Sequence, residues 1–109
     1  MPTDPSSPFD EVLAQRAADA LAELAAATGG AAVCRIGEDR VTTVKRLEGR
    51  STALADLVRR RRQHPDEDPA ASLAAVRCRW QQTPRLSPVW ETYADAGLES
   101  LAELAVAAG

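Results

Sequence analysis

The strongest constraint on the fold is a set of three prolines that each follow a side chain able to cap a helix: Ser7-Pro8, Asp68-Pro69 and Ser87-Pro88. Proline suits the first position of a helix, where its missing N–H would have no partner in any case. Ser and Asp accept hydrogen bonds from the free N–H groups of the first turn. Each pair therefore predicts a helix start, and together they predict a largely helical chain.

The segment after Ser7-Pro8 has apolar residues at steps of three and four and polar residues on the opposite face. The apolar set is Phe9, Leu13, Ala17, Leu21 and Leu24, and the polar set is Glu11, Gln15, Asp19 and Glu23. Asp10 lies three residues after Ser7, as in a capping box. This spacing is typical of an amphipathic helix, and Gly29-Gly30 is its expected end.

Two runs, 31–36 and 40–47, are rich in Val, Ile and Thr and flank Gly37. Short β-rich runs joined by a Gly-containing loop are typical of a β-hairpin. The alternative is a helix, because apolar residues recur every three positions from Val41 to Leu47. We favour the hairpin, since β-branched residues fill a helix poorly.

The later part of the chain predicts three more helical segments. Gly49 is expected to interrupt the pattern, and Ser51 to cap a helix that ends before Pro65. Pro84 is expected to end the next helix, and Gly97 either divides the last segment or permits a close helix crossing. The expected inward-facing residues are Leu54, Leu57, Val58, Leu73, Val76, Trp80, Trp90, Tyr93, Ala94, Leu98, Leu101, Leu104 and Ala105.

These elements predict an α+β fold that is mostly helical, with four or five helices and one short β-hairpin; an all-α bundle is the alternative. The 109 residues suit one domain. We expect residues 1–6 to form a disordered lead-in and residues 7–109 a single globular domain.

Composition argues against several classes of protein. No apolar run approaches the length of a membrane span, and the N-terminus lacks the features of a secretory signal. Two cysteines, Cys34 and Cys78, make no disulfide framework, which predicts a reducing cytoplasm. Twelve arginines against one lysine, with 22 alanines, are typical of a GC-rich bacterial genome.

The net charge of −3 is unevenly distributed, with −4 over residues 1–34, +5 over 35–62 and −4 over 63–109. Such a basic middle can bind an anionic partner or dock between the acidic helices, and we favour the internal role. Four consecutive arginines cover a full helical turn, so they cannot form one phosphate-binding row. The candidate partner or phosphate contacts are Arg46, Arg50, Arg59, Arg60, Arg61 and Arg62.

The sequence shows no catalytic or metal-binding constellation. His64, Cys34 and Cys78 lack the spacing of a zinc site, and no phosphate-loop motif is present. Free cysteines are commonly small buried hydrophobes, and we expect this of Cys34. For Cys78, between Arg77 and Arg79, a reactive thiolate is considered if the side chain is exposed. We therefore expect no catalytic residue, no metal and no cofactor.

Aromatic residues make up only 4% of the chain, and three of the four lie within 14 residues of one another. Large aromatic side chains on apolar helix faces either fill the core or anchor an interface with another chain. The candidate interface anchors are Trp80, Trp90, Tyr93, Leu98, Leu101 and Leu104.

The expected order of helix, hairpin and helix, with Leu21-x-Glu23-Leu24, Arg35-x-Gly37 and Val41, weakly resembles the Phd/YefM antitoxins over about a quarter of the chain. The strand that opens that family's fold has no counterpart here, so we carry over no residue role.

The function we expect is a small cytoplasmic, non-catalytic protein-interaction or regulatory module. We expect it to bind a second copy of itself, as a homodimer, or another protein, and we expect no membrane binding. One alternative is a nucleic-acid-binding, antitoxin-like regulator that uses the basic middle segment. The other is a small enzyme or enzyme accessory subunit.

Overall fold

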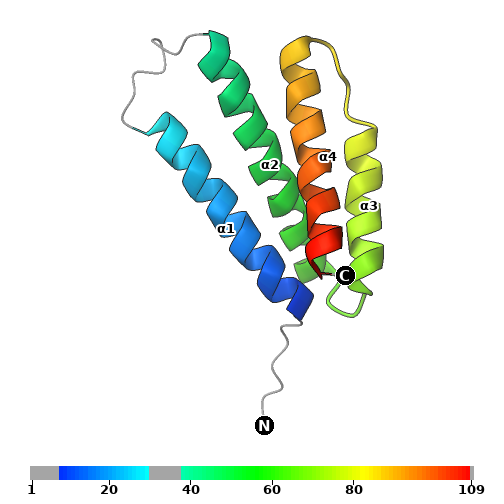
Figure 1. Cartoon of the computed structure of the whole chain (residues 1–109). Coiled ribbons are helices and arrows are strands. Elements are labelled where there is room, and N and C mark those ends of the chain that lie inside the picture. Colours follow the sequence, from blue (N-terminus) through cyan, green and yellow to red (C-terminus); the bar gives the residue numbers. More distant parts are fainter. Residues whose placement is uncertain (1–7, 30–37, 109) are drawn as a thin grey trace.

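The computed structural model describes residues 8–29 and 38–108, and the chain forms four helices there. They are α1 (Pro8–Thr28), α2 (Glu38–Gln63), α3 (Pro69–Gln81) and α4 (Pro88–Ala108). In Figure 1, α1 and α3 run in one direction and α2 and α4 in the other, so successive helices are antiparallel. The described part of the chain contains no strand, and its fold is an all-α bundle.

The predicted β-hairpin, and with it the α+β class, is wrong. Its second run, 40–47, lies inside α2, while its first run, 31–36, lies outside the described residues. Val44 and Leu47 are half-buried on α2, so the three-residue spacing of apolar positions was the informative signal. Packing of an apolar helix face outweighs the small intrinsic penalty of β-branched residues.

The predicted break at Gly49 and helix start at Ser51 are also wrong, because α2 runs unbroken through both. A Cβ on Gly49 would lie only 2.1 Å from the backbone oxygen of Tyr93 on α4. Glycine therefore lets the backbones of α2 and α4 meet at a distance that any other residue would prevent.

Gly97 follows the second of its two predicted roles, since α4 continues through it and a close packing contact forms there. A Cβ at Gly97 would come within 2.4 Å of the Trp80 ring. The missing side chain thus provides the space on α4 against which the indole of α3 packs.

The proline-marked helix starts are confirmed, because Pro8, Pro69 and Pro88 begin α1, α3 and α4. The Asp68 side chain accepts a hydrogen bond from the Ala70 N–H at 3.4 Å. The Ser87 hydroxyl accepts one from the Trp90 N–H, also at 3.4 Å. Ser7 lies outside the described residues.

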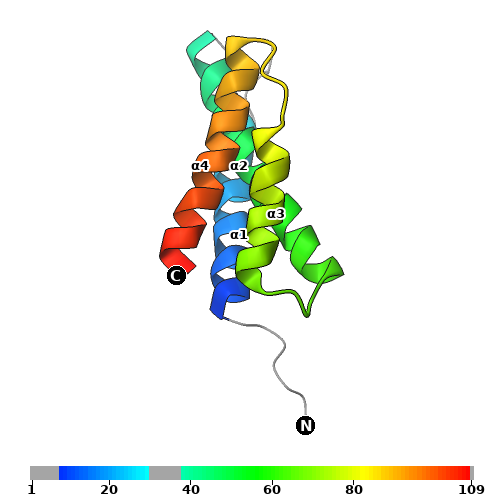
Figure 2. The same cartoon turned by 90° about the vertical axis from the view of Figure 1, so that its right-hand side faces the viewer.

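Helix α2 is the centre of the bundle, since it packs against the other three helices. Figure 1 shows α2 and α4 between α1 and α3, and Figure 2 shows α3 and α4 in front of α1. The fully buried apolar cluster comprises Leu13, Ala20, Ala53, Leu54, Leu57, Leu73, Val76, Trp80, Leu101 and Leu104. Among the described helices, none has the length and apolar character needed to cross a membrane.

Candidate functional site

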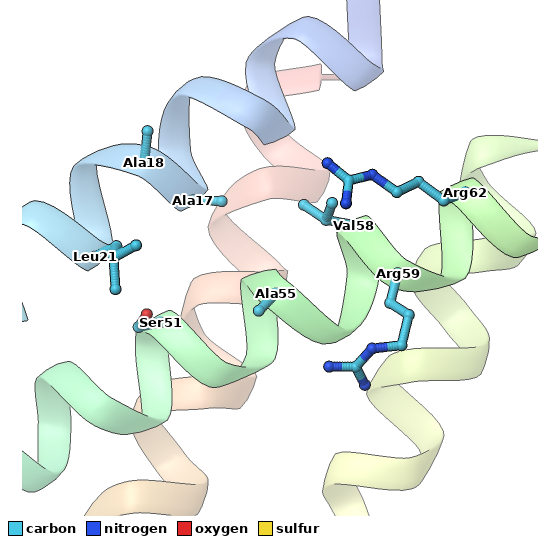
Figure 3. A pocket seen from close by; sticks show the side chains of 8 residues that line it. All are labelled: Ala17, Ala18, Leu21, Ser51, Ala55, Val58, Arg59 and Arg62. Carbon is cyan, nitrogen blue, oxygen red and sulfur yellow. The ribbon is translucent and has the colours of Figure 1, made fainter.

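A groove of about 400 Å³ lies between α1 and α2. Figure 3 shows its lining, with α4 passing behind the two helices, so the groove opens on the side away from α4. The lining residues are Ala17, Ala18 and Leu21 from α1 and Ser51, Ala55, Val58, Arg59 and Arg62 from α2. A second hollow of about 280 Å³ shares Val58 and Arg62 and continues the groove toward Pro65.

The floor of the groove is apolar and open to solvent. Leu21, expected to face the core, is instead 59% exposed, and Ala20 is fully buried next to it. Successive helical residues are rotated by about 100° around the axis, so the burial of Ala20 directs Leu21 to the side. Ala18 and Ala55 are also exposed, and their small side chains leave the space between the two helices unfilled.

Two arginines lie on the α2 side of this groove (Figure 3). Arg59 donates a hydrogen bond from Nη1 to Asp56 Oδ1 at 3.2 Å. Arg62 is exposed and forms no ion pair with any described residue. One end of an otherwise apolar groove therefore carries an uncompensated positive charge.

The two middle arginines of the run are bound inside the molecule. Arg60 makes two hydrogen bonds to the Glu67 carboxylate, at 2.9 and 2.7 Å. Arg61 binds Asp10 at the start of α1, with its Nε 2.8 Å from Oδ1. It also donates to the Glu67 backbone oxygen at 2.6 Å and to the buried Ser72 hydroxyl at 3.2 Å. These two arginines thus join the start of α1, the end of α2 and the α2–α3 connection.

Hydrogen bonds determine the ionisation of Glu67. The Arg60 guanidinium, and after it the Ser72 hydroxyl, lower the pKa of Glu67 to about 2. The Ser72 Oγ donates to Glu67 Oε1 at 2.7 Å. Arg60 and Arg61 are thus paired within the molecule, while Arg59 and Arg62 line the groove.

The remaining candidate arginines lie elsewhere, around a hollow of about 60 Å³ between α2 and α4. Arg46 and Arg50 share this hollow with Glu99 and Glu103. The Nε of Arg50 is buried and has no hydrogen-bond partner among the described residues. The six candidate arginines are therefore divided among three environments and do not form one basic surface.

The aromatic candidates differ in their exposure. Trp80 is only 5% exposed, and its Nε1 donates to Asp56 Oδ2 at 3.0 Å. Trp90 is 42% exposed, with Lys45 Nζ 4.6 Å from its ring centre. Tyr93 is half-buried, with its ring centre 5.2 Å from those of both tryptophans. Among the three, only Trp90 offers a large exposed ring.

The apolar anchors proposed on α4 lie mainly inward. Leu101 and Leu104 are buried, and Leu98 is half-buried against the same cluster. They pack this bundle together and present little surface to another chain.

The residues considered for chemistry do not come together. Cys78 is exposed and 3.5 Å from the Gln82 amide nitrogen, which donates to it. His64 is exposed after the end of α2, and Cys34 lies outside the described residues. In the described ranges no group of three or more His, Cys, Asp or Glu side chains is placed to hold a metal ion.

The groove between α1 and α2 was not predicted from the sequence. One available signal was that alanines extend the apolar surface of α1 beyond its buried stripe, as at Ala14, Ala18 and Ala25, all three of which are exposed. An apolar surface wider than one packing face indicates a second contact on the same helix.

No protein family, curated protein or solved structure matches this chain. The hairpin on which the resemblance to the Phd/YefM antitoxins depended is absent from residues 40–47, which belong to α2.

Proposed function

We propose that the protein is a non-catalytic, cytoplasmic interaction module that binds an amphipathic helix in the groove between α1 and α2. The observation that carries this proposal is the open apolar groove between two helices, on the side that α4 does not cover. Amphipathic helices commonly bind in apolar grooves through residues spaced three and four apart.

The dimensions and side chains of the groove suit such a ligand. Helices pack with their axes about 8–10 Å apart, and the closer distances need small residues at the contact. Ala18, Ala55 and Ser51 provide them, while the exposed Leu21 and half-buried Val58 supply apolar area. Burial of such area contributes about 25 cal/mol per Å².

The unpaired charge of Arg62 predicts a preference among the sequences of possible ligand helices. A ligand helix with an acidic residue over this end of the groove gains a hydrogen-bonded ion pair. We therefore expect the preferred ligand to be apolar along its length and acidic at that end.

Nucleic-acid binding has less support. A phosphate-binding surface needs several cations on one face, whereas Arg60 and Arg61 are bound to Glu67 and Asp10. Arg46 lies with two glutamates in a separate hollow.

A designed peptide tests the proposal directly. We expect a helix with Leu and Ala on one face and Glu at one end to shift the amide resonances of Ala18, Leu21 and Ala55 when it is titrated into ¹⁵N-labelled protein. A peptide of the same composition with scrambled order is expected to leave them unchanged.

Matched variants locate the binding surface. We expect Ala55→Arg to weaken the peptide at least about tenfold, because the long side chain fills the groove. Ala74→Arg places the same side chain on an exposed position of α3 and is expected to bind as the parent does. Equal binding by both variants, or by the scrambled peptide, would contradict the proposal.

A further inference from the structure

We infer that the partner of this grooved face is a second copy of the chain, in a dimer whose two-fold axis runs parallel to the groove, so that α1 of each copy packs on α2 of the other. This inference rests on the proposed function and adds the identity of the ligand. The order of charged and small side chains along the two groove walls supports it.

The α1 wall presents a row of side chains at steps of three and four along the helix, so that all of them point to one side. The row consists of Glu11, Ala14, Ala18, Leu21 and Ala25, and every member is exposed. It is therefore acidic at its first position and apolar from there onward.

The α2 wall presents a matching row in the opposite order along the chain. From the end of α2 backward it consists of Arg62, Val58, Ala55, Ser51 and Glu48. Ala18 and Ala55 line the same groove, and Ala14 lines the adjoining hollow with Arg62. Because the helices are antiparallel, Glu11 and Arg62 belong to the same end of the groove.

A two-fold axis parallel to the groove places α1 of each copy on α2 of the other, with the two helices antiparallel. Residues of the α1 row and the α2 row that lie at the same point along the groove then meet across the interface. Glu11 of one copy faces Arg62 of the other, and Ala18 faces Ala55. Two-fold symmetry makes every such contact twice.

The charges discriminate against the other face-to-face arrangement. An axis across the groove would lay α1 on α1 and α2 on α2, each antiparallel to its counterpart. Arg62 would then face Glu48, whose Oε1 is already paired with Lys45 Nζ at 3.3 Å, and Glu11 would face Ala25 at the apolar end of its own row. Glu11 would lose hydration there without gaining a partner, whereas the parallel axis gives both Glu11 and Arg62 an oppositely charged partner, so the parallel axis is favoured.

The size of the face sets the expected strength. A helix of 21 residues, the length of α1, is about 30 Å long, and two adjacent helices are about 20 Å wide. Each copy would then bury roughly 600 Å², which is near the lower limit for specific complexes. We therefore expect a reversible dimer with a dissociation constant in the micromolar range.

Charge reversal combined with sedimentation equilibrium tests the inference. We expect the full chain to dimerise and both Arg62→Glu and Glu11→Arg to weaken the dimer at least about tenfold, because each change acts at two symmetric contacts. The double variant is expected to restore dimerisation to within about threefold of the parent. Thermal unfolding followed by circular dichroism checks that each variant folds.

The control for Arg62→Glu is Arg79→Glu, since both residues are exposed and lie near the end of a helix, but Arg79 belongs to α3. It is expected to leave the dimer unchanged. A chain that stays monomeric at millimolar concentration, or a double variant that stays as weak as the single ones, would overturn the inference. Binding of the designed peptide by a monomeric chain would leave the proposed function intact, so the two failures are distinguishable.

Discussion

A single missing side chain sets the separation of the two central helices. At Gly49 the space for a Cβ is occupied by the backbone oxygen of Tyr93, 2.1 Å away. Backbone atoms cannot rotate out of the way as a flexible side chain can, so the contact requires glycine. Tyr93 also lies beside Trp90, three residues earlier on α4, and beside Trp80 of α3, with both ring centres 5.2 Å away.

Replacement of Gly49 by alanine separates packing from helix propensity. Propensity alone would raise the free energy of unfolding by about 1 kcal/mol. We expect Gly49→Ala to lower it by about 1–3 kcal/mol, as overpacked cores do, in urea unfolding followed by circular dichroism. Thr52→Ala, at an exposed position of the same helix, is expected to raise it by about 0.5 kcal/mol. Higher stability in both variants would show that the helices separate at little cost.

The two glycines show what could be predicted at the level of single residues. A close crossing at Gly97 was one of two predicted roles, and Trp80 lies there, within 2.4 Å of the Cβ position. Gly49 was predicted to be a break because glycine at a helix end and glycine at a crossing look alike along the chain. What distinguishes the crossing at Gly49 from a helix end is the contact with the Tyr93 backbone, and Tyr93 is distant in the sequence.

At the scale of the elements, one hydrogen-bonded cluster joins three helices. Arg61 binds Asp10 of α1 and the buried Ser72 of α3, and Glu67 binds Arg60 and Ser72. The cluster fixes the end of α2 against its neighbours, so its charge state affects the whole bundle.

The low pKa of Glu67 predicts a dependence of stability on pH. Its pKa is about 2 in the folded chain against an ordinary value of 4.5, so the ionised form is favoured by folding. This contribution to stability is complete above about pH 4.5 and is lost as the pH falls toward 2. We expect urea unfolding at pH 7 and pH 3 to show a smaller decrease for Glu67→Gln than for the parent chain. An equal decrease in both would assign the acid sensitivity to other carboxylates.

Helix starts were predicted more accurately than the first half of α2, because the interactions that determine them act over different distances along the chain. The starts of α1, α3 and α4 were correct because caps and prolines act within a few residues. The first half of α2 was not, because Thr42, Thr43 and the flanking valines favour strands locally. Val44 and Leu47 are half-buried there, and burial of a helix face in the bundle is a tertiary effect that local composition does not report.

At the scale of the molecule, the groove follows from which helices lie at the centre. Helices α2 and α4 occupy the middle of the bundle, with α1 on one side and α3 on the other (Figure 1). Helix α1 therefore packs chiefly on α2, and its outer row remains uncovered. The residues of the groove were visible in the sequence, but their exposure depends on this arrangement and could not be deduced from periodicity alone.

This arrangement predicts how α1 opens. Its N-terminal part, up to residue 20, is held by the buried Leu13 and Ala20 and by the ion pair of Asp10 with Arg61. No residue from 21 to 28 is fully buried. Segments with few buried contacts open most readily, so α1 is expected to separate from its C-terminal end while its N-terminal part stays docked.

Amide hydrogen exchange measures this order of opening. In the Arg62→Glu variant at low concentration we expect residues 21–28 to exchange at least about tenfold faster than residues 13–20, and the middle of α2 to exchange slowest. In the concentrated parent chain, a second copy would cover the α1 row and slow exchange around Leu21, whereas α3 would be unaffected. Uniform protection along α1 at low concentration would mean that the helix opens as one unit, and that the exposed groove wall is as firmly held as the core.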